Sequence, residues 1–206
     1  MMSLKECLID KYGYNEPIYV SEILYKNYSR QWIFKELKKL VDTGEIKRFD
    51  TGIYYFSKKM PWGDSTINPR KVLERRFLSD GNSVYGYIAG ASLLNQAGLS
   101  TQIPNLVELV TNNESTRVRD VTIGNQRIRA RRSRTTVTKE NVRTLQFLDL
   151  MNTIKPSSMD ETELFMLTKY TRASGVTRAS ISQYGGLFPA RAMKNIMESG
   201  AVYELA

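Results

Sequence analysis

The chain has 206 residues, 41% of them hydrophobic and 25% charged, which is enough to bury a core and to form two small domains. It contains no histidine, which excludes serine-histidine and cysteine-histidine catalysis and most zinc hydrolase sites, and we expect a protein that is not an enzyme and needs no cofactor or metal. No window of 18 apolar residues and no apolar N-terminal signal segment is present, so a cytoplasmic protein without a membrane segment is expected, with a net charge of +9 that favours an acidic partner.

The first elements form an N-terminal domain over residues 1–58. Leu4, Cys7 and Leu8 share one face of a first helix, on which the single cysteine is expected to be buried. A short second helix is expected at residues 21–24. A third helix follows from Ser29, which is placed to cap its start, to Gly44, which ends it. Its three- and four-residue spacing of apolar side chains predicts one apolar stripe of Ile33, Leu37, Leu40 and Val41.

After Gly44 the apolar period changes to two. The turn-forming residues 50–52 lie between two short runs of this period. Ile46 and Arg48 belong to the first run, and Ile53 and Tyr55 belong to the second. The sequence therefore predicts a hairpin directly after the third helix. Three helices and a hairpin make a winged helix-turn-helix, in which the third helix enters the major groove of DNA and the hairpin, or wing, lies along the backbone.

The charge of this segment favours double-stranded DNA as its partner. Residues 26–48 hold seven basic and three acidic side chains. We expect base contacts from the start of the third helix and phosphate contacts from the rest, which gives the candidate DNA-binding residues Arg30, Gln31, Lys35, Lys38, Lys39, Lys47 and Arg48.

Two other interpretations of this domain stay open. The first is a winged module used only for protein contacts, with a solvated basic helix. Glu45-Ile46-Lys47 also resembles the Glu-x-Lys end of a metal-dependent nuclease motif, although those residues already have a place beside the wing.

A linker is expected at residues 59–69, because proline, glycine and polar residues interrupt the apolar period there. The second domain, residues 70–206, is expected to be mixed α+β with a small sheet and several helices. Its predicted elements are helices at 70–78 and 83–97, strands at 106–111, 121–123 and 126–132, and helices at 142–152, 161–171, 177–183 and 189–198. Ser158 and Glu161 are expected to form a capping box before the helix at 161–171.

Arginines dominate the strand at 126–132 and the residues after it. Arg127, Arg129 and Arg131 alternate along one face, with Arg132 and Arg134 close behind. Because a guanidinium group pairs with carboxylates and phosphates alike, these five arginines are a candidate surface for an acidic protein partner or for further nucleic acid. The alternative is a charged edge strand that prevents sheet-to-sheet aggregation.

Gly86 and Gly90 lie four residues apart in the predicted helix at 83–97. A ligand pocket is one interpretation of that spacing. We favour packing, in which the small residues let one helix approach another.

Two segments resemble the AbiEi-type antitoxins of bacterial type IV toxin-antitoxin systems. The first is Gly44-Glu45-Ile46-Lys47-Arg48 with Gly52-Ile53-Tyr54-Tyr55, and the second runs from Tyr85-Gly86-Tyr87-Ile88-Ala89-Gly90-Ala91-Ser92 through Ile103-Pro104-Asn105 to Val110-Thr111-Asn112. The resemblance covers roughly the first two-thirds of the chain, and the residues after about Asn141 match no motif of the family.

The resemblance implies a transcriptional autorepressor that is also an antitoxin. In that family an N-terminal winged domain binds inverted repeats in the promoter of its own operon, and the C-terminal domain neutralises a nucleotidyltransferase-like toxin involved in phage defence by abortive infection. Inverted repeats imply two copies on DNA, whether or not the free protein is a monomer. A free-standing DNA-binding regulator without a toxin is the other possibility.

Overall fold

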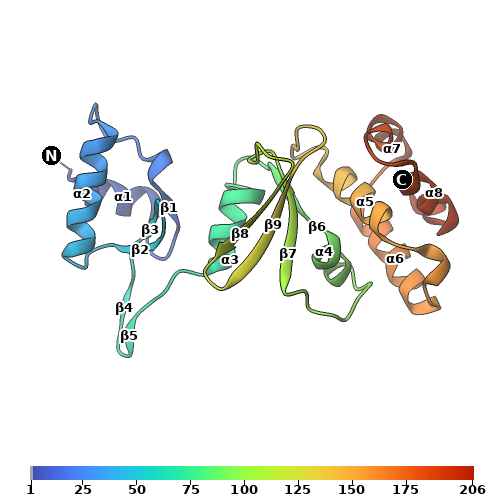
Figure 1. The fold of residues 1–206 in the computed structure, drawn as a ribbon, viewed down its shortest axis with the longest axis horizontal. Helices are drawn as coiled ribbons and strands as arrows, with labels where there is room; N and C mark the ends of the chain where they lie inside the picture. Colours follow the sequence, from blue (N-terminus) through green and yellow to red (C-terminus); the bar gives the residue numbers. More distant parts are fainter. Residues whose placement is uncertain (1) are drawn as a thin grey trace. The chain divides into compact units, whose positions relative to one another are not determined.

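The computed structural model describes residues 2–206 and has the mixed α+β architecture that the sequence predicts. The chain divides into two compact units, an N-terminal unit that extends to Arg75 and a C-terminal unit from Arg76 to Ala206 (Figure 1). Each has its own cluster of buried apolar side chains.

The first helix, α1 (Leu4–Tyr12), begins at a complete capping box. The Ser3 side chain accepts a hydrogen bond from the Glu6 N–H, and the Glu6 carboxylate accepts one from the Ser3 N–H. Leu4 and Leu8 are buried as predicted, whereas Cys7 is only partly buried at the rim of the same cluster.

The predicted second helix is replaced by a shorter turn. The strand β1 (Ile18–Tyr19) leads into the 3₁₀ turn η1 (Val20–Glu22), and no α-helix forms at residues 21–24. Ile23 becomes extended and is buried, while Leu24 is exposed. Four residues are too few to offset the cost of nucleating an α-helix, so tertiary packing decides the conformation.

The predicted third helix is α2 (Arg30–Asp42). Ser29 caps it by accepting a hydrogen bond from the Trp32 N–H, and the chain leaves it through Gly44, whose φ of 73° favours glycine. Ile33, Leu37 and Leu40 are buried against α1 and the sheet side of the unit, as the apolar stripe predicts.

The predicted wing follows as the antiparallel pair β2 (Lys47–Asp50) and β3 (Ile53–Tyr55). A bulge between Arg48 and Asp50 and the turn at Gly52, with φ 72°, reverse the chain. β3 also pairs with β1, so the sheet order is β1-β3-β2. The element order α1-β1-η1-α2-β2-β3 is that of a winged helix-turn-helix with a shortened middle helix.

The segment 59–69, expected as a linker, contains structure of its own. β4 (Lys59–Met60) and β5 (Gly63–Asp64) form a second small hairpin, and α3 (Pro69–Leu73) begins within the same segment. The Ser65 hydroxyl donates to the Asn15 side chain, and the Tyr19 hydroxyl donates to the Val72 carbonyl. These bonds attach residues 59–75 to the N-terminal unit. The boundary between the two units therefore follows Arg75 rather than lying between residues 58 and 70.

The predicted helix at 83–97 is wrong in its first half. Residues Gly86–Ala89 form the strand β6, and only Gly90–Gln96 form a helix, α4. Gly86 lies so close to its neighbours that a Cβ atom would be 2.0 Å from the Phe77 carbonyl oxygen. The close packing expected at Gly86 is therefore present, but a strand rather than a helix carries the glycine: β6 approaches the carbonyl of Phe77 in the helical turn Glu74–Leu78 and the carbonyl of Val110 in the neighbouring strand.

The four-stranded sheet of the C-terminal unit has the order β6-β7-β9-β8. β7 (Leu106–Thr111) is antiparallel to β6 and parallel to β9 (Gln126–Arg132), which forms a hairpin with β8 (Val118–Ile123) through Gly124 and Asn125. The arginine-rich strand β9 is thus an interior strand. The alternative that its arginines protect a sheet edge is contradicted, because β8 occupies the edge.

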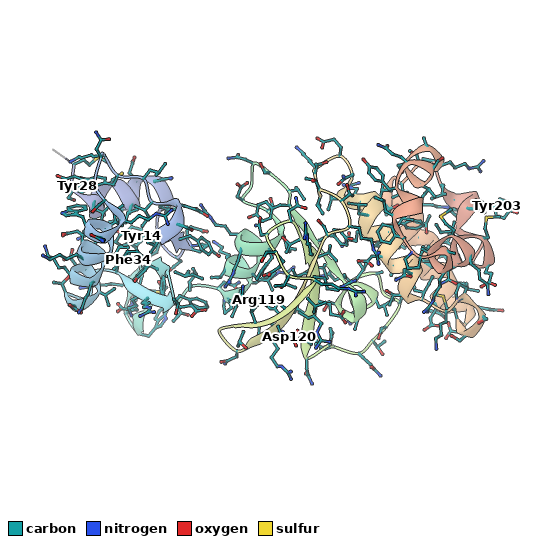
Figure 2. The ribbon with its side chains drawn as sticks, turned by 45° about the horizontal axis from the view of Figure 1, so that its top comes forward. Tyr14, Tyr28, Phe34, Arg119, Asp120 and Tyr203 are labelled. Carbon is teal, nitrogen blue, oxygen red and sulfur yellow. The ribbon has the colours of Figure 1, made fainter. Side chains whose placement is uncertain are left out.

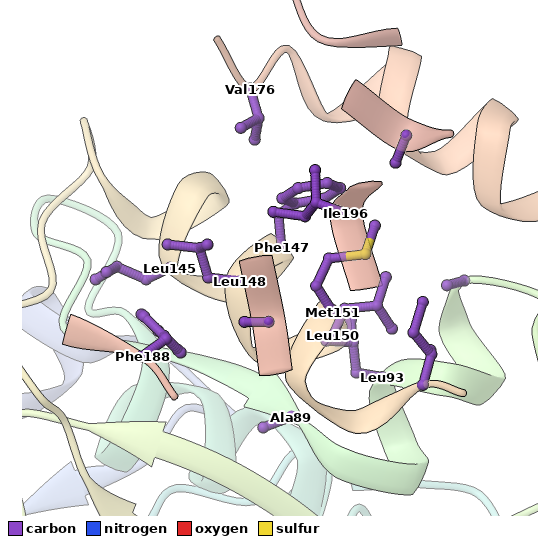
Figure 3. Close-up of a cluster of buried hydrophobic side chains, with 14 of the residues drawn as sticks. Ala89, Leu93, Leu145, Phe147, Leu148, Leu150, Met151, Val176, Phe188 and Ile196 are labelled. Carbon is purple, nitrogen blue, oxygen red and sulfur yellow. The ribbon is translucent and has the colours of Figure 1, made fainter. Parts of the chain in front are cut away.

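Helices cover one half of this sheet and complete the unit. α5 (Val142–Thr153) is buried on nearly all sides and packs against β6 and α8 (Ala190–Glu198), with α6 (Glu161–Ser174) and α7 (Arg178–Tyr184) beside it. Phe147, Leu148 and Met151 lie at the centre of the cluster (Figure 3). The predicted capping box at Ser158 is wrong: Asp160 and Glu163 cap α6, and Ser158 lies in a preceding 3₁₀ turn.

Asn195 ties α8 to the end of α5. Its side chain, 5% exposed, donates hydrogen bonds to the carbonyls of Met151 (2.7 Å) and Ile154 (2.9 Å). Asn195→Ala should lower the free energy of unfolding by about 2 kcal/mol, because a buried carbonyl loses its donor. Urea unfolding followed by far-UV circular dichroism measures this. Asn152→Ala, on the partly exposed side of α5, is the control, and equal losses in both variants would contradict the assigned role.

None of the helices formed by residues 2–206 combines the length and apolar character needed to cross a bilayer.

Candidate nucleic-acid interface

The exposed face of α2 brings most of the predicted DNA-binding residues together. Ser29 fixes the start of the helix, so Arg30 is its first residue and Gln31 its second. Lys35 and Lys38 follow at the helical spacing that keeps them on the same side. The exposed members of this face are Arg30, Gln31, Phe34, Lys35, Lys38 and Lys39.

Three of these cations have no internal partner. Within the described part of the chain, Arg30, Lys35 and Lys38 make neither an ion pair nor a side-chain hydrogen bond. Lys39 is paired with Glu36 at 3.0 Å. The face is therefore positive, and its charge is available to an external anion.

The wing holds its two predicted cations differently. Arg48 donates to the Asp50 carbonyl and to the Thr51 hydroxyl, which places its guanidinium group at the turn of the β2–β3 hairpin. Lys47 is paired with Asp64 at 2.7 Å, and this carboxylate raises the pKa of Lys47 while its own pKa is lowered. Lys47 is thus compensated within the unit, which the sequence interpretation did not foresee.

Aromatic side chains flank the start of α2. Trp32 stacks on Tyr28 with 4.1 Å between ring centroids, and Tyr25 stacks on both. Trp32 is partly buried against the apolar cluster, so it completes the packing of the unit. Phe34, in contrast, is 50% exposed between Gln31 and Lys38, and no sequence signal singled it out (Figure 2).

The β4–β5 hairpin adds a second projection that was predicted as a linker. Lys58, Lys59 and Met60 are exposed along it, and Trp62 at its turn is 80% exposed. The ion pair between Lys47 and Asp64 joins this hairpin to the wing. The signal available in the sequence was the Pro-Trp-Gly turn directly after a run with two lysines.

The Glu-x-Lys segment is occupied by structural pairs. Glu45 is paired with Lys5 at 2.6 Å, Lys47 with Asp64, and Ile46 between them is buried. No group of three or more aspartate, glutamate or cysteine side chains suited to a metal ion occurs among residues 2–206.

Some of the five predicted arginines of the C-terminal unit bind carboxylates within the unit, and others are exposed without such a partner among the described residues. As predicted, Arg127, Arg129 and Arg131 alternate with the buried Ile128 and Ala130 on β9. Arg129 makes a two-bond pair with Asp120 on β8, labelled in Figure 2, at 2.8 and 2.9 Å.

The other arginines lie nearer the helices. Arg131 binds the buried Asp149 of α5 at 3.1 Å. Arg134 donates to the Leu187 carbonyl and lies over the Phe188 ring. The partners Asp120 and Asp149 are distant from β9 in sequence, so the sequence did not identify them. Arg127 and Arg132 are exposed.

No protein-family model matches this chain, and no curated protein matches it. The likeness to AbiEi-type antitoxins stays a prediction from the residues that resemble that family.

Proposed function

We propose that the protein binds duplex DNA through α2 and the β2–β3 wing and represses transcription by occupying a promoter. The exposed cations Arg30, Lys35 and Lys38, which lack internal partners among the described residues, are the observation that supports this most strongly. Phosphate contacts supply affinity, and the start of α2 supplies sequence choice.

The residues have distinct roles in this proposal. Arg30 and Gln31, at the start of α2, are suited to two-bond contacts with guanine and adenine edges. Lys35, Lys38, Lys39 and Arg48 contact phosphates. Lys47 contributes less than its sequence position suggested, because a phosphate has to displace Asp64 first.

On the resemblance to AbiEi-type antitoxins, we further propose that the promoter is that of a toxin-antitoxin operon and that the C-terminal unit neutralises a nucleotidyltransferase-like toxin. Two copies then occupy an inverted repeat. Co-expression with a toxin encoded by a neighbouring gene tests the antitoxin part separately from DNA binding. If the toxin stays toxic when the two proteins are co-expressed, the antitoxin part is wrong and a free-standing DNA-binding regulator is the function that is left.

Salt dependence tests the DNA-binding part. The four phosphate contacts of Lys35, Lys38, Lys39 and Arg48 give a slope of about −3.6 for the logarithm of affinity against the logarithm of salt concentration. Affinity for a promoter duplex should therefore fall roughly a hundredfold between 50 and 200 mM salt. Fluorescence anisotropy with labelled promoter and random duplexes measures both slopes. A flat response would instead favour a winged module that contacts only proteins.

A further inference from the structure

A pocket of about 490 Å³ in the C-terminal unit lies where the helices stop covering the sheet. Its floor is one row of residues that are directly opposite one another across all four strands: Tyr87, Val110, Arg131 and Val118. Residues paired in this way project from the same face of a sheet. Three of the four are apolar or aromatic, but Tyr87 and Val110 are buried, so the apolar surface open to a ligand comes mainly from Val118, which is 48% exposed.

Four arginines line this pocket. Arg131 comes from the floor, Arg117 precedes β8, and Arg132 and Arg134 follow from the end of β9. The backbone N–H of Arg132 donates to the Arg117 carbonyl at 3.2 Å, which keeps these two residues beside each other. Arg117 and Arg132 are exposed, and within residues 2–206 their side chains make no hydrogen bond or ion pair.

The one carboxylate that lines the pocket is already committed. Asp149, 3% exposed, accepts hydrogen bonds from the Arg131 guanidinium at 3.1 Å and from the Tyr87 hydroxyl at 3.3 Å. Burial, together with the charge of Asp149, raises the pKa of Tyr87 well above its usual value, so this hydroxyl stays a donor. Asp149 thus orients Arg131 and leaves the other three arginines uncompensated.

Arg131 also adds its charge to the pocket. Its side chain is 28% exposed beside the buried Asp149. Its Nε atom is enclosed and has no hydrogen-bond partner among the described residues, so an anion would contact the exposed part of the guanidinium group instead. The guanidinium geometry suits the oxygens of phosphate in particular.

We propose that this pocket binds a nucleotide, with its phosphates on Arg117, Arg131, Arg132 and Arg134 and its base against the exposed side chain of Val118. The volume is that of a small-molecule site, since such sites span about 300–1,000 Å³. Exposed apolar surface at Val118 beside several convergent cations fits a ligand that joins a flat ring to a phosphate chain. This inference goes beyond the proposed DNA binding and does not depend on it, because every residue of the pocket belongs to the C-terminal unit.

Isothermal titration calorimetry of the full chain tests it, with ATP, GTP, CTP and UTP as probes. Inorganic triphosphate and adenosine are the two fragments to compare. At least one nucleotide should bind more tightly than either fragment. If no nucleotide binds, the proposal is overturned. If hexaglutamate binds and no nucleotide does, the pocket is assigned to an acidic peptide instead.

Matched variants place the binding in this pocket. Arg117→Ala and Arg132→Ala should each weaken nucleotide affinity about tenfold or more, because each removes a charge-assisted hydrogen bond. Arg127→Ala removes the same charge from the same strand outside the pocket and should change nothing. These three side chains are exposed, so the variants should fold, which thermal melts without ligand verify.

A variant of the N-terminal unit separates the two proposals. If the triple change Arg30→Ala, Lys35→Ala and Lys38→Ala weakens nucleotide binding and Arg132→Ala does not, the nucleotide binds at α2 and the pocket assignment is wrong. The reverse pattern supports the pocket, whatever the outcome of the DNA measurements.

Discussion

Replacing Arg30, Lys35 and Lys38 together by alanine should lower DNA affinity by about a hundredfold to a thousandfold at 0.1 M salt. The lost phosphate contacts of Lys35 and Lys38 remove roughly 1.8 from the salt slope, which is almost two orders of magnitude in affinity at this salt concentration. The lost base contacts of Arg30 weaken binding to the promoter sequence by roughly a further tenfold. These side chains are exposed on α2 and support no other residue, so the variant should keep its folded structure. Anisotropy titrations at several salt concentrations give both the affinity and the slope.

The matched control removes the same charge from elsewhere. Lys155, Lys169 and Lys194 are exposed in the helical part of the C-terminal unit, and their triple replacement by alanine lowers the net charge equally. This control should keep nearly all of its DNA affinity. Equal losses in the two variants would show that overall charge, rather than the face of α2, determines binding.

Gly86→Ala should unfold the C-terminal unit or destabilise it by about 3 kcal/mol or more, because overpacking against fixed atoms is costly. A Cβ atom at this position would lie 2.0 Å from the Phe77 carbonyl oxygen and 2.7 Å from that of Val110. Both are backbone atoms, so neither can move aside by changing a side-chain rotamer. Urea unfolding followed by far-UV circular dichroism measures the loss.

Gly186→Ala is the control, since open space surrounds that position and its φ is not positive. Both tryptophans, Trp32 and Trp62, belong to the N-terminal unit, so their fluorescence follows that unit separately. We expect the fluorescence transition to survive in Gly86→Ala while the dichroism signal is reduced. A dichroism transition like that of the unchanged protein would refute the close packing at Gly86.

Local signals in the sequence predicted the winged part of the fold well. The apolar stripe of α2, its Ser29 cap and the turn at Gly52 are all set by neighbours in sequence, and each was found where expected. The short turn η1 was not predictable in this way, because packing rather than helical propensity decides its conformation. β6 was missed for a related reason: a strand buried beside β7 has a continuous apolar run that a helix can also have.

The sequence predicted which charged residues belong to the candidate sites, but it did not predict which of them form ion pairs within the protein. Alternation on β9 correctly placed Arg127, Arg129 and Arg131 on one face. Only the tertiary structure shows that β8 covers the edge and that Asp149, on a helix after the sheet, turns Arg131 into part of a buried pair. Likewise, Lys47 and Asp64 are separated by the wing and a second turn, so their ion pair has no local signature.

The sheet of the C-terminal unit is joined from two antiparallel modules by a single parallel seam. β6 and β7 form one module and the β8–β9 hairpin the other, and only the contact between β7 and β9 unites them. The arginine pocket straddles this seam, since Tyr87 and Val110 come from one module and Arg131 and Val118 from the other. A ligand held there would therefore bind both modules at once and hold them together.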